Sequence, residues 1–156
     1  QGNSNSFNSI EAYASRGSIV TPTINAADDS LFGYIHHGYD GTQYVQSSYI
    51  VAGIDSQASV GVGAMPGNIL LGTTPDNGST VNSVVINKDG NLGVNTLTPS
   101  KKLVVNGNAQ VVNELLLGNM DQTAIDALTG ANGMIVYNTS TNKFQGYENG
   151  AWANLI

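Results

Sequence analysis

Short runs of β-branched and aromatic residues recur along most of this 156-residue chain, and clusters of Gly, Asn, Asp and Pro separate them. Such a pattern is typical of β-strands that are joined by tight turns. We therefore expect an all-β fold of short strands and hairpins. The predicted strands cover residues 8–14, 31–37, 43–54, 68–73, 81–87, 102–106, 109–117, 133–138, 143–147 and 151–155.

The dipeptides between these runs support the prediction. Asp40-Gly41, Asp89-Gly90, Asn106-Gly107 and Asn149-Gly150 all suit turn positions that need a positive φ. The last of them lies between "FQGYE" and "AWANL", and an Asn-Gly pair between two apolar runs is a strong hairpin signal. A C-terminal β-hairpin is therefore the firmest local prediction.

One segment, "NMDQTAIDALTG", predicts a short helix over about residues 120–129. Asn119 or Asp121 can cap its start, and Gly130 can end it. The residues expected on its apolar face are Met120, Ala124, Ile125 and Leu128. An isolated helix of this length is unstable in water, so we expect it to pack on another element and to link two β units.

Some predicted strands are apolar on both faces. In "YIVAGID", the alternating positions 49, 51, 53 and 50, 52, 54 are all nonpolar or aromatic, and "NELLLG" places leucines on both sides. Strands of this kind need cover on both faces. Because the chain offers one small helix to supply that cover, we expect a symmetric oligomer that shares its core.

Composition narrows the classes of partner. Charged residues make up 10% of the chain, against about 25% in an ordinary soluble domain, and the net charge is −6. Five scattered Lys and Arg residues do not form the basic surface that nucleic acid requires, so we expect no nucleic-acid partner. No apolar run approaches the roughly 20 residues of a membrane helix, and we expect no membrane insertion. The hydrophobic fraction of 40% indicates a folded chain.

The stretch 86–107, "INKDGNLGVNTLTPSKKLVVNG", invites a test for a metal or phosphate loop. Aligning Gly90 with the invariant glycine of a calcium loop puts Val85 first and Thr96 last, and neither supplies a carboxylate. No Gly-Lys-Ser/Thr follows, so a phosphate loop is also excluded. We interpret the stretch as a connection: one β unit ends at Asp89-Gly90, the chain crosses through Thr98-Pro99, and a new strand leads toward the C-terminal part.

Catalytic and metal-binding groups are sparse. His36 and His37 are adjacent in a predicted strand and point to opposite faces, so they cannot share one metal ion within a chain; three copies of one histidine around a threefold axis remain an alternative. No nucleophile-elbow sequence is present. The acidic candidates are interpreted as loop and capping residues: Asp28, Asp29, Asp121 and Asp126. We expect no enzyme activity, no metal and no cofactor.

Aromatic residues are the remaining candidates for recognition. Tyr147 and Trp152 flank the predicted C-terminal hairpin, where their flat faces suit stacking on sugars. The same residue types fill β cores equally well. Other aromatic residues with the same two alternatives are Tyr34, Tyr39, Tyr44 and Tyr49.

Several short motifs follow one another in a fixed order over about residues 14–107. They are Arg16-Gly17, Thr21-Pro22, "GYDGT" at 38–42, "MPG" at 65–67, "TTPDNG" at 73–78 and "DGNLGVNTLTP" at 89–99. In order and spacing this segment resembles the region of bacteriophage tail-fibre proteins that lies upstream of S74-type intramolecular chaperone domains. It departs from that pattern at Asn95, where the family has Gly, at the inserted Asn77, and at "SVVIN", which replaces an Arg-Met-Arg strand.

The C-terminal run "LTGANGMIVYNTSTNKFQGYENGAWANLI" is similar to a β module found on phage fibres and on fibre-like surface proteins of bacteria, including predatory ones. The resemblance implies an elongated, intertwined homotrimer outside the cell, on a virion tail fibre, a bacterial surface or in the periplasm. Residues 1–107 would form a β-rich shaft or head, and residues 108–156 a tip module.

From the resemblance we expect a fibre-tip adhesin that recognises a cell-surface glycan or envelope component. The expected ligand-binding residues are Tyr137, Tyr147, Asn149 and Trp152. Two alternatives stay open, namely a structural trimerising spacer with recognition elsewhere, and a polysaccharide-cleaving enzyme.

Overall fold

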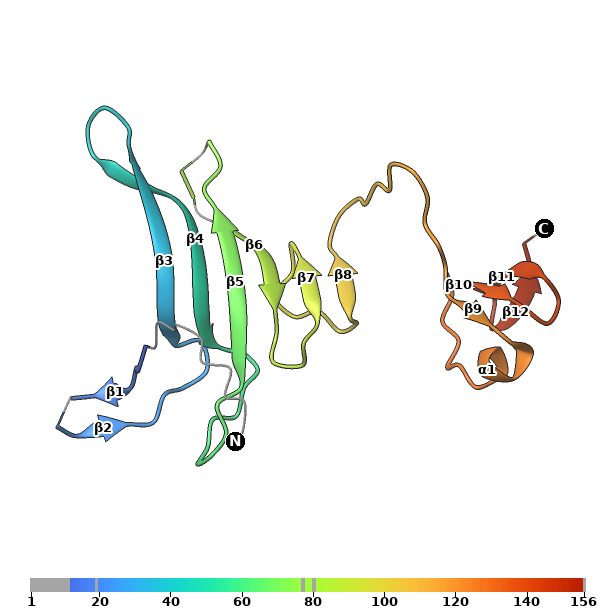
Figure 1. Cartoon of the computed structure of the whole chain (residues 1–156), viewed down its shortest axis with the longest axis horizontal. Helices are drawn as coiled ribbons and strands as arrows, with labels where there is room; N and C mark the ends of the chain where they lie inside the picture. The colour runs from blue at the N-terminus through green and yellow to red at the C-terminus, as the bar shows by residue number, and fades with distance from the viewer. Residues whose placement is uncertain (1–11, 19, 77, 80, 156) are drawn as a thin grey trace, which may run out of the picture. The chain divides into compact units, whose positions relative to one another are not determined.

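The structure, a computed structural model, describes residues 12–18, 20–76, 78–79 and 81–155. The chain divides into two compact units, Gln1–Ala109 and Gln110–Ile156, hereafter unit 1 and unit 2 (Figure 1). The division expected from the sequence lies between residues 107 and 108. Both units are built mainly from β-strands, which confirms the all-β prediction.

Unit 1 contains one six-stranded sheet whose strands lie side by side in the order of the sequence (Figure 1). All neighbouring pairs are antiparallel except the last, which is parallel. The strands are β3 (Ser30–Tyr39), β4 (Tyr44–Ile54), β5 (Gly67–Thr73), β6 (Val81–Ile86), β7 (Leu92–Val94) and β8 (Leu103–Val105). Five of these correspond to predicted strands, and β7 was missed: its three residues include Gly93 and lie between turn residues.

The turn of the β3–β4 hairpin is held by the residue types at its positions. Its turn covers residues 40–43, and Gly41 has a φ of 100°. The Asp40 carboxylate accepts hydrogen bonds from the backbone amides of Gln43 and Thr42, both at 2.8 Å. These amide bonds hold the pKa of Asp40 below its usual range. The turn is thus fixed by the residue types that predicted it.

A small ribbon precedes this sheet. Its strands are β1 (Arg16–Gly17) and β2 (Pro22–Thr23). Arg16 donates two hydrogen bonds, of 2.7 and 2.8 Å, to the Asp29 carboxylate just before β3. The predicted strand over residues 8–14 is not found at 12–14, and its residues 8–11 lie outside the described part of the chain.

The stretch 86–107 stays within the same sheet. Residues Asp89-Gly90 turn β6 into β7, and the crossing through Thr98-Pro99 joins β7 to the parallel strand β8. The Asn87 side chain holds the turn by accepting hydrogen bonds from the amides of Asp89 and Asn91. The interpretation that a β unit ends at Asp89-Gly90 is therefore wrong, because the chain returns to pair with its own preceding strand.

The predicted strand over 109–117 is also wrong. This segment has no regular secondary structure, although its composition favours a strand. A strand forms only where another strand supplies its backbone hydrogen bonds, and this segment pairs with none. Most of its apolar side chains are exposed, Leu116 at 88%.

Unit 2 is a four-stranded sheet with a short helix (Figure 1). Its strands, in spatial order, are β12 (Ala151–Asn154), β11 (Lys143–Glu148), β10 (Ile135–Asn138) and β9 (Asn119–Met120). Helix α1 (Gln122–Asp126) is shorter than predicted. Asp121 caps it as expected by accepting from the Ala124 amide at 2.8 Å, but Ala127, not Gly130, ends it, and Met120 belongs to β9.

Helix α1 contacts one face of this sheet, through the hydrogen bond between Gln122 and Asn138. Ile125 is fully buried, and Val136 on β10 is buried as well. Asn138 is buried beside them and donates to Gln122 of the helix at 2.7 Å and to Gln145 of β11 at 3.1 Å. A short helix that would be unstable alone is thus held by apolar burial and by side-chain hydrogen bonds.

Candidate functional site

The C-terminal hairpin has the predicted geometry. Strands β11 and β12 are joined by Asn149 and Gly150, whose φ values of 50° and 83° are both positive. Two positive φ values in a two-residue loop match the type I′ turn that an Asn-Gly pair favours. The turn places Tyr147 directly opposite Trp152 across the two strands.

Tyr147 and Trp152 form a compact aromatic pair. Their ring centres are 5.2 Å apart at an interplanar angle of 76°, and the Tyr147 hydroxyl donates to the Gly150 carbonyl at 2.9 Å. The Tyr147 ring also lies against Gly130, where a Cβ would come within 2.1 Å of it. Both aromatic residues are half-buried, and Asn149 is exposed. The hairpin end therefore offers part of a fixed aromatic surface next to a polar amide.

Tyr137 lies elsewhere. It is on the opposite face of the sheet from Tyr147, because the register pairs Tyr137 with Phe144 and pairs Val136 with Gln145. The Tyr137 and Phe144 ring centres are 5.1 Å apart. Of the four predicted ligand-binding residues, Tyr147, Asn149 and Trp152 thus lie together and Tyr137 does not.

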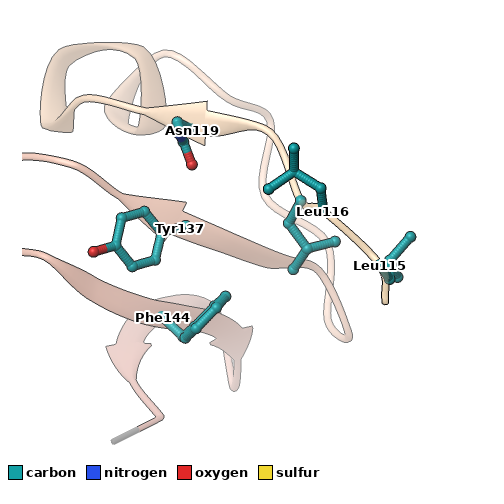
Figure 2. A pocket seen from close by; sticks show the side chains of 6 residues that line it. Leu115, Leu116, Asn119, Tyr137 and Phe144 are labelled. Carbon is teal, nitrogen blue, oxygen red and sulfur yellow. The ribbon is translucent and has the colours of Figure 1, made fainter. Parts of the chain in front are cut away.

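Tyr137 lines an apolar hollow of about 240 Å³. Figure 2 shows its ring beside Phe144, with Leu115 and Leu116 on the segment that leads into β9. The full lining is Leu115, Leu116, Leu117, Asn119, Tyr137 and Phe144. The sequence analysis did not include Phe144 among the candidate residues, although neighbouring residues of a strand alternate and Phe144 therefore lies on the opposite face from Gln145. It treated the leucines only as residues of a predicted strand.

The acidic candidates have local structural partners. Asp121 caps α1, Asp126 accepts from the Gln122 side chain at 2.7 Å, and Asp29 binds Arg16. Within residues 12–155, leaving aside the few undescribed positions, no three His, Asp or Glu side chains gather as a metal site would require. His36 shares a hydrogen bond with Ser48 at 3.1 Å.

No helix among the described residues is both long and apolar enough to cross a membrane. No protein-family model matches the chain, and no curated protein sequence matches it.

Proposed function

We propose that this chain is the protomer of a homotrimeric, extracellular fibre, of a phage tail or a bacterial surface, and that unit 2 serves as its adhesive tip. The observation that carries this proposal is the amount of apolar surface that one chain leaves uncovered. Only four hydrophobic residues are buried among those that the structure describes: Ile54, Val85, Ile125 and Val136. A single chain would therefore fold around very little core.

Burial of these exposed side chains favours assembly. Tyr34 is 51% exposed and Leu103 is 60% exposed, and both lie in regular strands. Full burial of one large apolar side chain is worth about 1.5–3 kcal/mol. Several copies that share a core recover this free energy at many positions at once, and a closed cyclic assembly leaves no open surface of the same kind.

The recognition surface that we propose consists of Tyr147, Asn149 and Trp152. The half-buried aromatic pair gives a rigid apolar face, and the exposed Asn149 amide offers both a donor and an acceptor. Sugars present the matching chemistry, with C–H groups on their faces and hydroxyls at their edges. A cell-surface glycan is therefore the ligand class that we propose.

A glycan array with labelled protein tests this proposal. We expect reproducible binding that falls about tenfold or more, equivalent to about 1.4 kcal/mol, in Trp152→Ala. Tyr44→Ala is the control, because Tyr44 is an exposed aromatic residue in unit 1 and lies outside the proposed surface. Equal binding by wild type and Trp152→Ala would overturn the assignment of the site.

The second candidate function is a trimerising spacer. It is favoured by the contacts of Tyr147, which packs on Gly130 and Trp152 and bonds to Gly150, as a purely structural residue would. Light scattering tests both proposals together: a mass near three times 16.2 kDa agrees with both, and a monomer contradicts both. A trimer that binds no glycan on a broad array favours the spacer.

A further inference from the structure

We infer that one face of the unit 1 sheet is the surface that packs against the same face of other copies of this chain. The inference rests on the proposed homotrimer and specifies which surface forms its core. Two adjacent rows of this face, hereafter the apolar sheet face, cross all six strands and carry twelve aliphatic or aromatic side chains. They are Phe32, Tyr34, Ile50, Ala52, Ile69, Leu71, Val84, Ile86, Leu92, Val94, Leu103 and Val105.

Every position on the apolar sheet face is aliphatic or aromatic, and most are exposed. The face continues without a polar interruption from the β3 edge, at Phe32 and Tyr34, to the β8 edge, at Leu103. A sheet in contact with water on one side normally alternates apolar and polar residues. The same side of the sheet carries His36, Ser48 and Thr73 next to these rows. Two apolar rows that cross all six strands, with no polar group except the Tyr34 hydroxyl, nevertheless indicate burial against another apolar surface.

The opposite face is already partly closed by its own chain. Val85 is 1% exposed, and the Tyr49 ring covers Gly72, where a Cβ would lie 2.2 Å from it. The two faces of one sheet therefore differ. Val85 is buried on one, whereas none of the twelve side chains of the apolar sheet face is buried, although Ile54 is buried on the same side at the end of β4.

The distribution of charge identifies another copy as the occupant. None of the residues of β3 to β8 is Asp, Glu, Lys or Arg. The described aspartates of unit 1 lie in turns and connections outside these strands: Asp28, Asp29, Asp40, Asp55, Asp76 and Asp89. Two copies that each carry a net charge of −6 can thus meet on this face without burying a charge or opposing like charges.

The size of the face supports the same occupant. With strands about 4.8 Å apart, the outer strands of the unit 1 sheet lie about 24 Å apart, whereas those of the unit 2 sheet lie about 14 Å apart. Unit 2 also narrows to the two-residue strand β9. Its sheet is too small to cover the apolar sheet face, while a second unit 1 sheet has the same breadth and the same chemistry.

The decisive experiment uses Leu71, near the middle of the face, and Val62, a fully exposed residue in the connection between β4 and β5. We expect Leu71→Asp to reduce the mass measured by light scattering from three chains to one, and Val62→Asp to leave it unchanged. Because the natural chain has no cysteine, Ile50→Cys gives a milder second measurement in a chain that still assembles. We expect a short bis-maleimide to cross-link Ile50→Cys between chains and Val62→Cys to remain uncross-linked.

The outcomes separate this inference from the proposed function. A monomeric wild type overturns both. A trimer that survives Leu71→Asp and gives no cross-link at Ile50→Cys overturns the inference alone, since the copies then meet elsewhere. Binding of wild type to phosphatidylcholine vesicles, abolished by Leu71→Asp, would also overturn it, because the face would then be a lipid-contacting surface.

Discussion

The two units of this chain differ in how their apolar side chains are covered. Each is a β-sheet with apolar side chains on both faces, and each needs cover for them. Unit 2 supplies cover for one face with α1 and so buries Ile125 and Val136. Unit 1 has only strands and turns, and its largest apolar face stays open. One short helix thus distinguishes a sheet whose apolar face is covered within the chain from a sheet whose apolar face is left open.

The largest loss of stability should follow from removing the buried apolar side chain of helix α1. Ile125→Ala leaves a cavity between α1 and β10, and we expect unit 2 to lose about 2–5 kcal/mol of unfolding free energy. Unit 1 should keep its stability, because its sheet does not use this residue. Denaturant titration followed by residue-resolved NMR measures both units in one sample.

Leu128→Ala is the matched control, since Leu128 is 37% exposed; it should cost much less. Simultaneous unfolding of unit 1 and unit 2 in Ile125→Ala would contradict the view that unit 2 has a core of its own.

A smaller effect should follow loss of the helix cap. Asp121→Ala removes the acceptor for the Ala124 amide, and we expect a loss of about 1 kcal/mol from unit 2. Asp121→Asn keeps a side-chain oxygen at the same place and should retain most of the stability. If both variants behaved like wild type in thermal unfolding, the cap would not contribute to holding α1 on the sheet.

The smallest effect concerns pH and unit 1 alone. The Arg16 hydrogen bond, followed by that from the Ala26 amide, holds the pKa of Asp29 below its usual range. The stabilisation is therefore complete above the usual carboxyl pKa and is lost as the pH falls through the lower, folded value. We expect the NMR resonance of the Arg16 Nε–H to shift in that acidic range. Resonances of unit 2 residues that are far from any carboxylate should stay constant.

Asp29→Asn is the control, because it removes the titrating group; its Arg16 resonance should show no such step. A step at the usual carboxyl pKa in wild type would mean that the ion pair does not persist in solution.

The sequence predicted the turns and strands that depend on neighbouring residues. It failed where a strand forms only by pairing with a distant segment. Strands such as β3 and β4 and the Asn149-Gly150 turn follow from local patterns, and they were predicted. Residues 109–117 also have a composition that favours a strand, but no strand pairs with them, so they remain irregular.

The candidate site shows the same limit. Tyr137 and Tyr147 lie on adjacent predicted strands, but only the register, which a sequence does not display, places them on opposite faces. The hairpin end with Tyr147, Asn149 and Trp152 could be predicted, because one turn holds all three. The hollow beside Tyr137 could not, since its leucines come from a segment that has no regular secondary structure.

The strand order of unit 1 has a consequence for how the protein is made. Because β3 to β8 lie side by side in the order of synthesis, each new strand finds its neighbour already in place. Topologies with such local pairing fold faster than those that join distant segments. A nascent chain can therefore complete its sheet without a partner. In the trimer that we propose, the concentration-dependent step is then the meeting of finished sheets.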